Sequence, residues 1–268
     1  MTLLRKLIYI FLIFVCSWGM GLADETSESV LDKIKKRQEL IVCISVDYFG
    51  ITYRDPKTGL LSGVDNDMAQ AFAKDLGVRL SFTESTYSAL YKDIDENRCD
   101  IAMFGLGFTQ ERAAKMRLSQ PYLISDIYAI VSKSNRRINS WADIDQPGVV
   151  IVVVRGTTHE TNLRQRLKFA TLSTKGTGFE REVELLSGRA DVLMTDYPYS
   201  QYFLKQAKWA RRVEPEGHFA RTPYVYATKR GDEVWGRRVD QFVSTIKSDG
   251  RLHASTERYG LSAILFED

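Results

Sequence analysis

The chain is poor in the residue types from which most metal centres are built. Its 268 residues include only three cysteines and three histidines, and no two histidines stand at metal-ligand spacing. The sequence therefore predicts no metal site, and we expect each histidine to lie on the surface. They are His159, His218 and His253.

Nucleotide-binding and hydrolase motifs are also missing. Gly105 and Gly107 follow a strand-like run, but no third glycine completes a dinucleotide fingerprint after them. The sequence contains neither a phosphate-binding P-loop nor a G-x-S-x-G nucleophile elbow. These absences argue against a nucleotide cofactor and a serine hydrolase, and we expect no cofactor.

No apolar run is long enough for a membrane-spanning helix, which needs about 20 residues. The run from Leu7 to Val15 follows Arg5 and Lys6 and precedes the small residues Gly-Leu-Ala. This order is typical of a secretory signal peptide rather than a retained membrane anchor. We predict a signal peptide over residues 1–23, cleaved after Ala23, and therefore a periplasmic protein.

The chain also lacks a strong excess of either charge. Removing Arg5 and Lys6 from the 37 basic residues leaves 35, against 34 acidic residues. No basic run is interleaved with aromatic residues, so the sequence predicts no nucleic-acid partner.

Two cysteines remain after the signal peptide, each in or beside an apolar, strand-like run. They are Cys43 and Cys99. An oxidising compartment would permit a disulfide between them. A chain of this length can build a large core without one. We therefore expect two buried free thiols.

Strand and helix patterns alternate along the first half of the chain. The β-branched run "ELIVCISV" predicts a strand buried on both faces. "VDNDMAQAFAKDLG" follows with helical spacing, Asp65 as its expected N-cap and Gly77 as its end. "VRLSF" and "DIAMF" predict further strands, with a helix between them. This alternation is typical of parallel sheets, and a second series of the same layout begins near "SWADIDQPGV".

Several segments together resemble the family 3 extracellular solute-binding proteins, the amino-acid receptors of ABC importers. They are "GVDNDMAQAFAKDLGV", "DIAMFGLGFTQER", "SQPY", "RGTTHE" and "ADVLMTD", in this order. The resemblance implies a type II periplasmic-binding-protein fold of the α/β class. Each of two lobes would hold a mostly parallel sheet flanked by helices, and two hinge strands would join them. Lobe 1 would comprise residues 24–129 and 225–268, and lobe 2 residues 130–224, with crossings near 128–132 and 224–228.

The resemblance also implies a ligand site between the lobes. Arg112 would hold the ligand's carboxylate as a bidentate guanidinium, with Thr109 in reach of the same group. Asp196 would take the ammonium group, although it could simply cap the following helix. The remaining ligand-binding residues would be Gly107, the "GTT" segment with Thr157 and Thr158, and the aromatic residues Tyr48 (or Phe49) and Tyr87.

The chain departs from the family pattern in two glycines. Many members carry serines where this chain has Gly105 and Gly107. The missing hydroxyls suggest an unusual amino acid, or a carboxylate without an ammonium group. The resemblance further implies the membrane subunits of an ABC importer as partners, and we expect a monomer.

An enzyme on the same fold is the alternative interpretation. The stretches "LDKI", "DMAQ", "DIAM", "IDQPGV" and "LMTD" also resemble cyclohexadienyl dehydratases, which act on prephenate or arogenate. Glu160 matches the position of an acidic residue in that subgroup's "G-G-T-N-E-K" stretch. The second Gly, the Asn and the Lys of that stretch are here Thr158, His159 and Thr161. This difference favours a binding protein over an enzyme.

Overall fold

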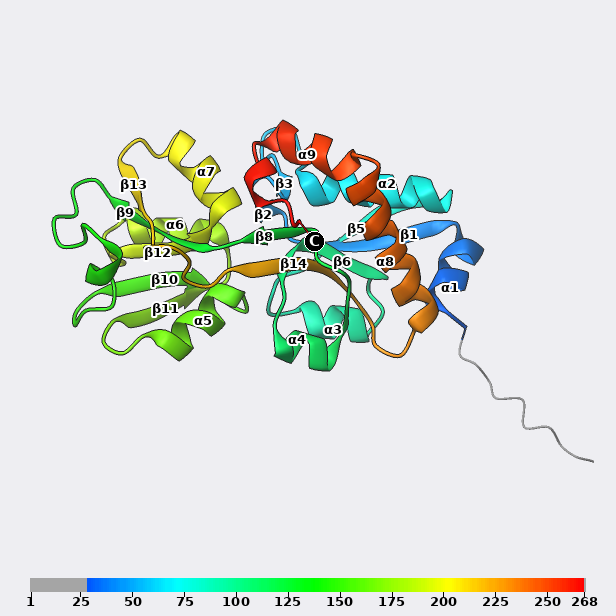
Figure 1. The fold of residues 1–268 in the computed structure, drawn as a ribbon, viewed down its shortest axis with the longest axis horizontal. Coiled ribbons are helices and arrows are strands. Elements are labelled where there is room, and N and C mark those ends of the chain that lie inside the picture. The colour runs from blue at the N-terminus through cyan, green and yellow to red at the C-terminus, as the bar shows by residue number, and fades with distance from the viewer. Residues whose placement is uncertain (1–27, 268) are drawn as a thin grey trace, which may run out of the picture.

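The computed structural model describes residues 28–267, so the predicted signal peptide lies outside the described residues. Figure 1 shows two groups of helices and strands side by side, joined by extended segments. Within residues 28–267, no helix combines the length and apolar character needed to cross a membrane.

The first lobe is built on a sheet with the strand order β5-β1-β6-β14-β7, in which β8 also pairs with β14. Three parallel strands form one half, β1 (Glu39–Ile44), β5 (Arg79–Glu84) and β6 (Ile101–Gly107). The antiparallel half consists of β14 (Thr222–Thr228), β7 (Arg117–Leu118) and β8 (Leu123–Ser125). A small antiparallel sheet beside it contains β2 (Asp47–Tyr48), β3 (Thr52–Arg54) and β4 (Leu61–Ser62).

Helices cover both faces of this first sheet. In the view of Figure 1, α2 (Val64–Leu76) and α9 (Arg251–Tyr259) lie above it, and α3 (Leu90–Asp95) and α4 (Gln110–Lys115) lie below it. The remaining helices of this lobe are α1 (Val30–Arg37), α8 (Glu233–Ser248) and the short 3-10 turn η2 (Ser262–Ile264). Strand β6 is buried along its whole length, as expected of a strand covered on both sides.

The second lobe repeats the layout with the strand order β11-β10-β12-β9-β13. Its parallel strands are β10 (Val150–Val154), β11 (Thr171–Lys175) and β12 (Val192–Asp196), and its antiparallel strands are β9 (Ile127–Ser132) and β13 (Ala210–Val213). Its helices are α5 (Thr158–Arg166), α6 (Gly178–Leu186), α7 (Tyr197–Gln206) and the 3-10 turn η1 (Trp141–Asp143). The predicted α/β fold is confirmed, and both sheets are mixed because the strands next to the crossings run antiparallel.

The chain changes lobes between β8 and β9, at Asp126, and returns between β13 and β14. All of β9 therefore belongs to the second sheet and all of β14 to the first, a few residues from the predicted crossings. Asp126 holds the two crossings together. Its carboxylate accepts hydrogen bonds from the backbone N–H groups of Phe219 (3.1 Å) and Ala220 (2.7 Å) on the returning segment.

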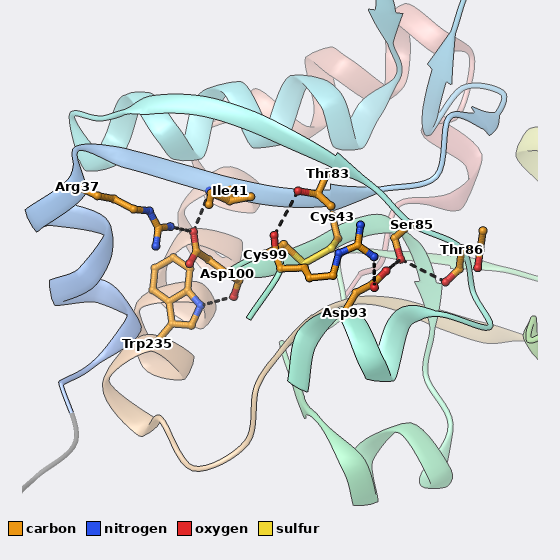
Figure 2. Close-up of a disulfide and its surroundings, with 11 residues drawn as sticks. Arg37, Ile41, Cys43, Thr83, Ser85, Thr86, Asp93, Cys99, Asp100 and Trp235 are labelled. Atoms are coloured by element: carbon orange, nitrogen blue, oxygen red, sulfur yellow. Dashed lines mark hydrogen bonds and ion pairs between the residues drawn. A yellow bond between two sulfur atoms is a disulfide. The ribbon is translucent and has the colours of Figure 1, made fainter. Parts of the chain in front are cut away.

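The prediction of two free thiols is wrong, because Cys43 and Cys99 form a disulfide (Figure 2). Cys43 lies in β1, and Cys99 stands just before β6, which pairs with β1 in parallel. This pairing brings the two Cα atoms within 5.5 Å, a usual separation for a disulfide. The sequence shows two strands here but does not show that they are neighbours.

Candidate functional site

A cavity of about 610 Å³ lies between the two lobes. Segments that follow the carboxyl ends of parallel strands line it from both sides, as in other open α/β sheets. The first lobe contributes residues after β1 and β5, and the second lobe contributes residues at the ends of β10, β11 and β12. A volume of this size suits a small organic molecule.

Four of the predicted ligand-binding residues line this cavity, and four do not. The lining residues are Tyr48, Tyr87, Thr157 and Asp196, and the others are Gly107, Thr109, Arg112 and Thr158. Phe49, the alternative to Tyr48, stacks on Tyr202 at a centroid distance of 3.7 Å instead.

Asp196 both caps a helix and faces the first lobe. Its Oδ1 accepts the backbone N–H of Tyr199 (3.2 Å), as the N-cap of α7. Its Oδ2 accepts hydrogen bonds from the hydroxyl groups of Tyr48 and Tyr224, the latter at 2.8 Å. Burial raises the pKa of both tyrosines well above the ordinary value, so both keep the protons that they donate. This buried cluster joins the lobes directly.

Arg112 also joins the lobes. Thr109 is the N-cap of α4 and accepts the Arg112 backbone N–H (3.0 Å), which fixes the start of the helix. The guanidinium donates to the carbonyl oxygens of Gly107 (2.6 Å) and, across the cleft, Gly156 (2.8 Å). The Cζ atom of Arg112 lies 5.9 Å from the centre of the Tyr87 ring, and Tyr87 lines the cavity. Burial lowers the pKa of Arg112, which forms no salt bridge to any described residue.

The two unusual glycines leave room for neighbouring side chains, Gly105 within the first lobe and Gly107 between the two lobes. A Cβ on Gly105 would lie 2.4 Å from the Tyr48 ring, and one on Gly107 would lie 2.7 Å from the Thr158 methyl group. Serine at either position would therefore push these side chains away. The Tyr48 ring fills the space of a side chain at position 105, and the Thr158 methyl group fills that at position 107.

The prediction that His159 lies on the surface is wrong. The side chain lines the cavity and the residue is only 8% exposed. Its Nε2 lies 3.8 Å from the Asp196 carboxylate, and its buried Nδ1 has no hydrogen-bond partner. Burial lowers the pKa of His159 to about 4, so the imidazole is neutral near pH 7. Sequence reasoning missed this residue because the sequence of α5 alone does not show that the helix borders a cavity.

Several charged residues of the cavity were not predicted, and two of them, Asp47 and Arg181, come from opposite lobes. Asp47 accepts the backbone N–H of Gly178 (2.7 Å) across the cleft, at the positive end of α6. Arg181 is 3% exposed and also lines the cavity. No motif marks either residue in the sequence. Across residues 28–267, no cluster of three or more histidine, cysteine, aspartate or glutamate residues could hold a metal ion.

Glu160 has a local role in the second lobe. One carboxylate oxygen accepts the Gly156 N–H (2.7 Å), and the other accepts two bonds from the Arg164 guanidinium (2.9 and 2.7 Å). The residue is not among those that line the cavity. Its carboxylate thus stabilises the first turn of α5.

Comparison with known proteins adds to this picture. The model of the bacterial extracellular solute-binding proteins, family 3, matches residues 40–262. Cyclohexadienyl dehydratase of Pseudomonas aeruginosa is 31% identical over 236 residues, 88% of this chain and 87% of that protein. The L-cystine-binding protein TcyJ of Escherichia coli is 28% identical over 241 residues, 90% of each chain.

A solved structure is similar over the same region. It is that of the ancestral amino acid-binding protein AncCDT-1, a precursor of cyclohexadienyl dehydratase. The match has a TM-score of 0.80 and 32% identity, and it covers 86% of this chain and 99% of the other.

Proposed function

Because the chain belongs to family 3 of the bacterial extracellular solute-binding proteins, we propose that it binds an amino acid or a related small carboxylate between its lobes. The observation that supports this most is the inter-lobe cavity, with a buried guanidinium and a buried carboxylate at its border. These two charges complement the two ends of an α-amino acid. The amino-acid binding of relatives such as TcyJ points the same way.

Arg112 is the group that we assign to the ligand's carboxylate. A buried cation without an anionic partner is costly, and a carboxylate beside it removes that cost. The ligand would replace the Gly156 carbonyl as acceptor at Nη2. That exchange requires the second lobe to rotate about the crossings at Asp126 and between β13 and β14, as hinged two-lobe proteins do.

Asp196 is the group that we assign to an ammonium, where the ligand has one. Its Oδ2 already accepts two tyrosine hydroxyl groups, so an ammonium would share or displace them. A ligand without an ammonium would leave this cluster intact. Both ligand classes therefore belong in a binding screen.

Replacing Arg112 with alanine is expected to weaken ligand binding by about 2 kcal/mol or more, roughly a 30-fold loss of affinity. The measurement is calorimetric titration with the tightest ligand found by thermal shift among the amino acids and their oxo acids. Lys115→Ala, on an exposed site of the same helix, is the control and should bind normally. Unchanged affinity in Arg112→Ala, with a normal circular dichroism spectrum, would contradict the assignment.

For its biological role, we propose that the protein delivers its ligand to the membrane subunits of an ABC importer, as a single copy in the periplasm. Relatives named for importers, and the extracellular character of the family, support this role.

A second function has support from the similarity to cyclohexadienyl dehydratase. That reaction removes hydroxide, which needs an acid that gives up a proton. Glu160, the candidate acid, instead accepts hydrogen bonds at both oxygens, from Gly156 and Arg164. Its environment therefore favours a structural carboxylate over a proton donor.

We accordingly expect no turnover of prephenate or arogenate by the purified protein, as followed by chromatography of the aromatic products. Glu160→Gln serves as the matched variant, since the amide can still accept a hydrogen bond. Aromatic product from the wild type that disappears in Glu160→Gln would favour the dehydratase instead.

A further inference from the structure

A buried cation, Arg181, lines the cavity on the lobe opposite Arg112. Arg181 extends from α6, and its guanidinium lies over the Tyr199 ring at 4.3 Å from the centroid. Nη1 donates to the Met194 carbonyl (3.0 Å), but the buried Nε has no hydrogen-bond partner. No acidic residue in the described part of the chain forms a salt bridge with it. The α-carboxylate of a ligand can compensate Arg112, but it leaves Arg181 without a directly bonded anion, since the nearby Glu182 carboxylate accepts the Tyr199 hydroxyl instead.

His159 lines the same cavity and has a second unpartnered polar atom. It comes from α5, the helix next to β10, and its Nδ1 is buried without a partner. Both Arg181 and Arg112 lower its pKa through their charges, which places the imidazole within the field of both guanidinium groups. A neutral imidazole can donate one N–H to an anion at this position.

The acidic residues of the cavity, in contrast, all have partners. Asp93 accepts hydrogen bonds from Arg98 (2.6 Å) and Ser85 (2.5 Å), and Asp47 accepts them from Ser45 and the Gly178 N–H. The other two acids are Asp196, bonded as described above, and Glu84, which pairs with Arg54. Among the residues that line the cavity, the buried polar atoms without a partner belong to Arg181 and His159. This imbalance favours an anionic side chain on the ligand over a cationic one.

We propose that Arg181 and His159 form a second anion subsite, and that the ligand is a small dicarboxylate. One carboxylate would bind Arg112, and the other would bind Arg181 from the second lobe. This class includes acidic amino acids and the corresponding oxo acids. An amino acid would present an ammonium group to Asp196, whereas an oxo acid would present a carbonyl group. This inference rests on the proposed binding function.

Wild-type affinities give the first test. We would measure dissociation constants by calorimetry for L-glutamate, L-aspartate, L-glutamine, L-arginine and 2-oxoglutarate. L-Glutamate, L-aspartate or 2-oxoglutarate should bind at least about tenfold more tightly than L-glutamine, because a charge-assisted pair replaces a neutral contact. The comparison of L-glutamate with 2-oxoglutarate shows whether the ammonium contributes. Tighter binding of L-arginine or L-glutamine would overturn the dicarboxylate proposal but keep the binding function. Absence of binding by every probe, and by every other amino acid, would contradict the proposed function itself.

Variants of Arg181 give the second test. Arg181→Met keeps the apolar contact with Tyr199 and removes the charge, so it should weaken the dicarboxylate by at least about tenfold. L-Glutamine should bind within about twofold of its wild-type affinity, and Arg181→Lys should recover part of the loss. An equal loss for both ligands would indicate a structural role and overturn the assignment of Arg181. If Arg181→Met fails to fold, the wild-type preference between the three dicarboxylates and L-glutamine still decides the proposal.

Discussion

Removing the disulfide by replacing Cys43 and Cys99 with alanine is expected to lower the free energy of unfolding by about 4 kcal/mol. The two residues are 56 positions apart, and a cross-link of that span removes much loop freedom from the unfolded chain. Both side chains are buried in the native protein, at 0% and 5% exposed, so the loss also includes packing contacts. The measurement is urea unfolding with linear extrapolation.

Reduction of the wild-type protein provides the control for this experiment. A thiol reductant should shift the wild-type unfolding curve most of the way to that of the double variant, and it should leave the variant unchanged. A variant that unfolds at the wild-type urea concentration would contradict the expected contribution of the cross-link.

The position of the disulfide also connects it to the cavity. Cys99 follows Arg98, whose guanidinium binds the buried carboxylate of Asp93, and both Arg98 and Asp93 line the cavity. The cross-link thus fixes the wall of the cavity that the first lobe provides.

The alternation of strand and helix patterns was sufficient to predict the α/β fold, whereas the candidate site residues came from the family resemblance. Asp196 ends a strand and begins a helix, and both features are visible in "ADVLMTDYP". The order of strands within a sheet is not encoded locally, which is why the Cys43–Cys99 pair was missed. His159 lines a cavity that both lobes form, so the residues of α5 alone give no indication of its position. Arg181 looks like one more charged residue of an amphipathic helix until Tyr199 and the cavity are placed beside it.

Asp65 is a further residue whose role changes in the structure. It was predicted to cap α2, but the N-cap is Gly63, and Asp65 is the second residue of the helix and fully buried. Its carboxylate accepts hydrogen bonds from the hydroxyl groups of Tyr122 (2.7 Å) and Tyr226 (3.2 Å) and from the Gly105 N–H (2.7 Å). Gly105 lies two residues before Gly107, the last residue of β6, whose carbonyl accepts a hydrogen bond from Arg112. The buried Asp65 carboxyl therefore holds the backbone of β6 next to Arg112. Burial raises the pKa of Asp65 to about 7, against the lowering effect of these hydrogen bonds.

Asp65 should therefore make the protein less stable as the pH rises from 4 to 8. The unfolded carboxyl loses its proton near its ordinary pKa of 3.8, whereas the folded one keeps it until about pH 7. The contribution of Asp65 to stability is thus fully present below the unfolded pKa and is lost progressively as the pH rises to the folded pKa of about 7. A difference of about three pKa units amounts to about 4 kcal/mol of unfolding free energy. Asp65→Asn, which resembles the neutral acid, should lack this loss of stability, while Asp67→Asn on the same helix should keep it.

Urea unfolding at pH 4 and pH 8 measures the change in the free energy of unfolding. His159 also has a shifted pKa, but it contributes equally to every variant, so its effect cancels when the variants are compared. Parallel pH dependence in the wild type and Asp65→Asn would show that folding does not raise the pKa of Asp65.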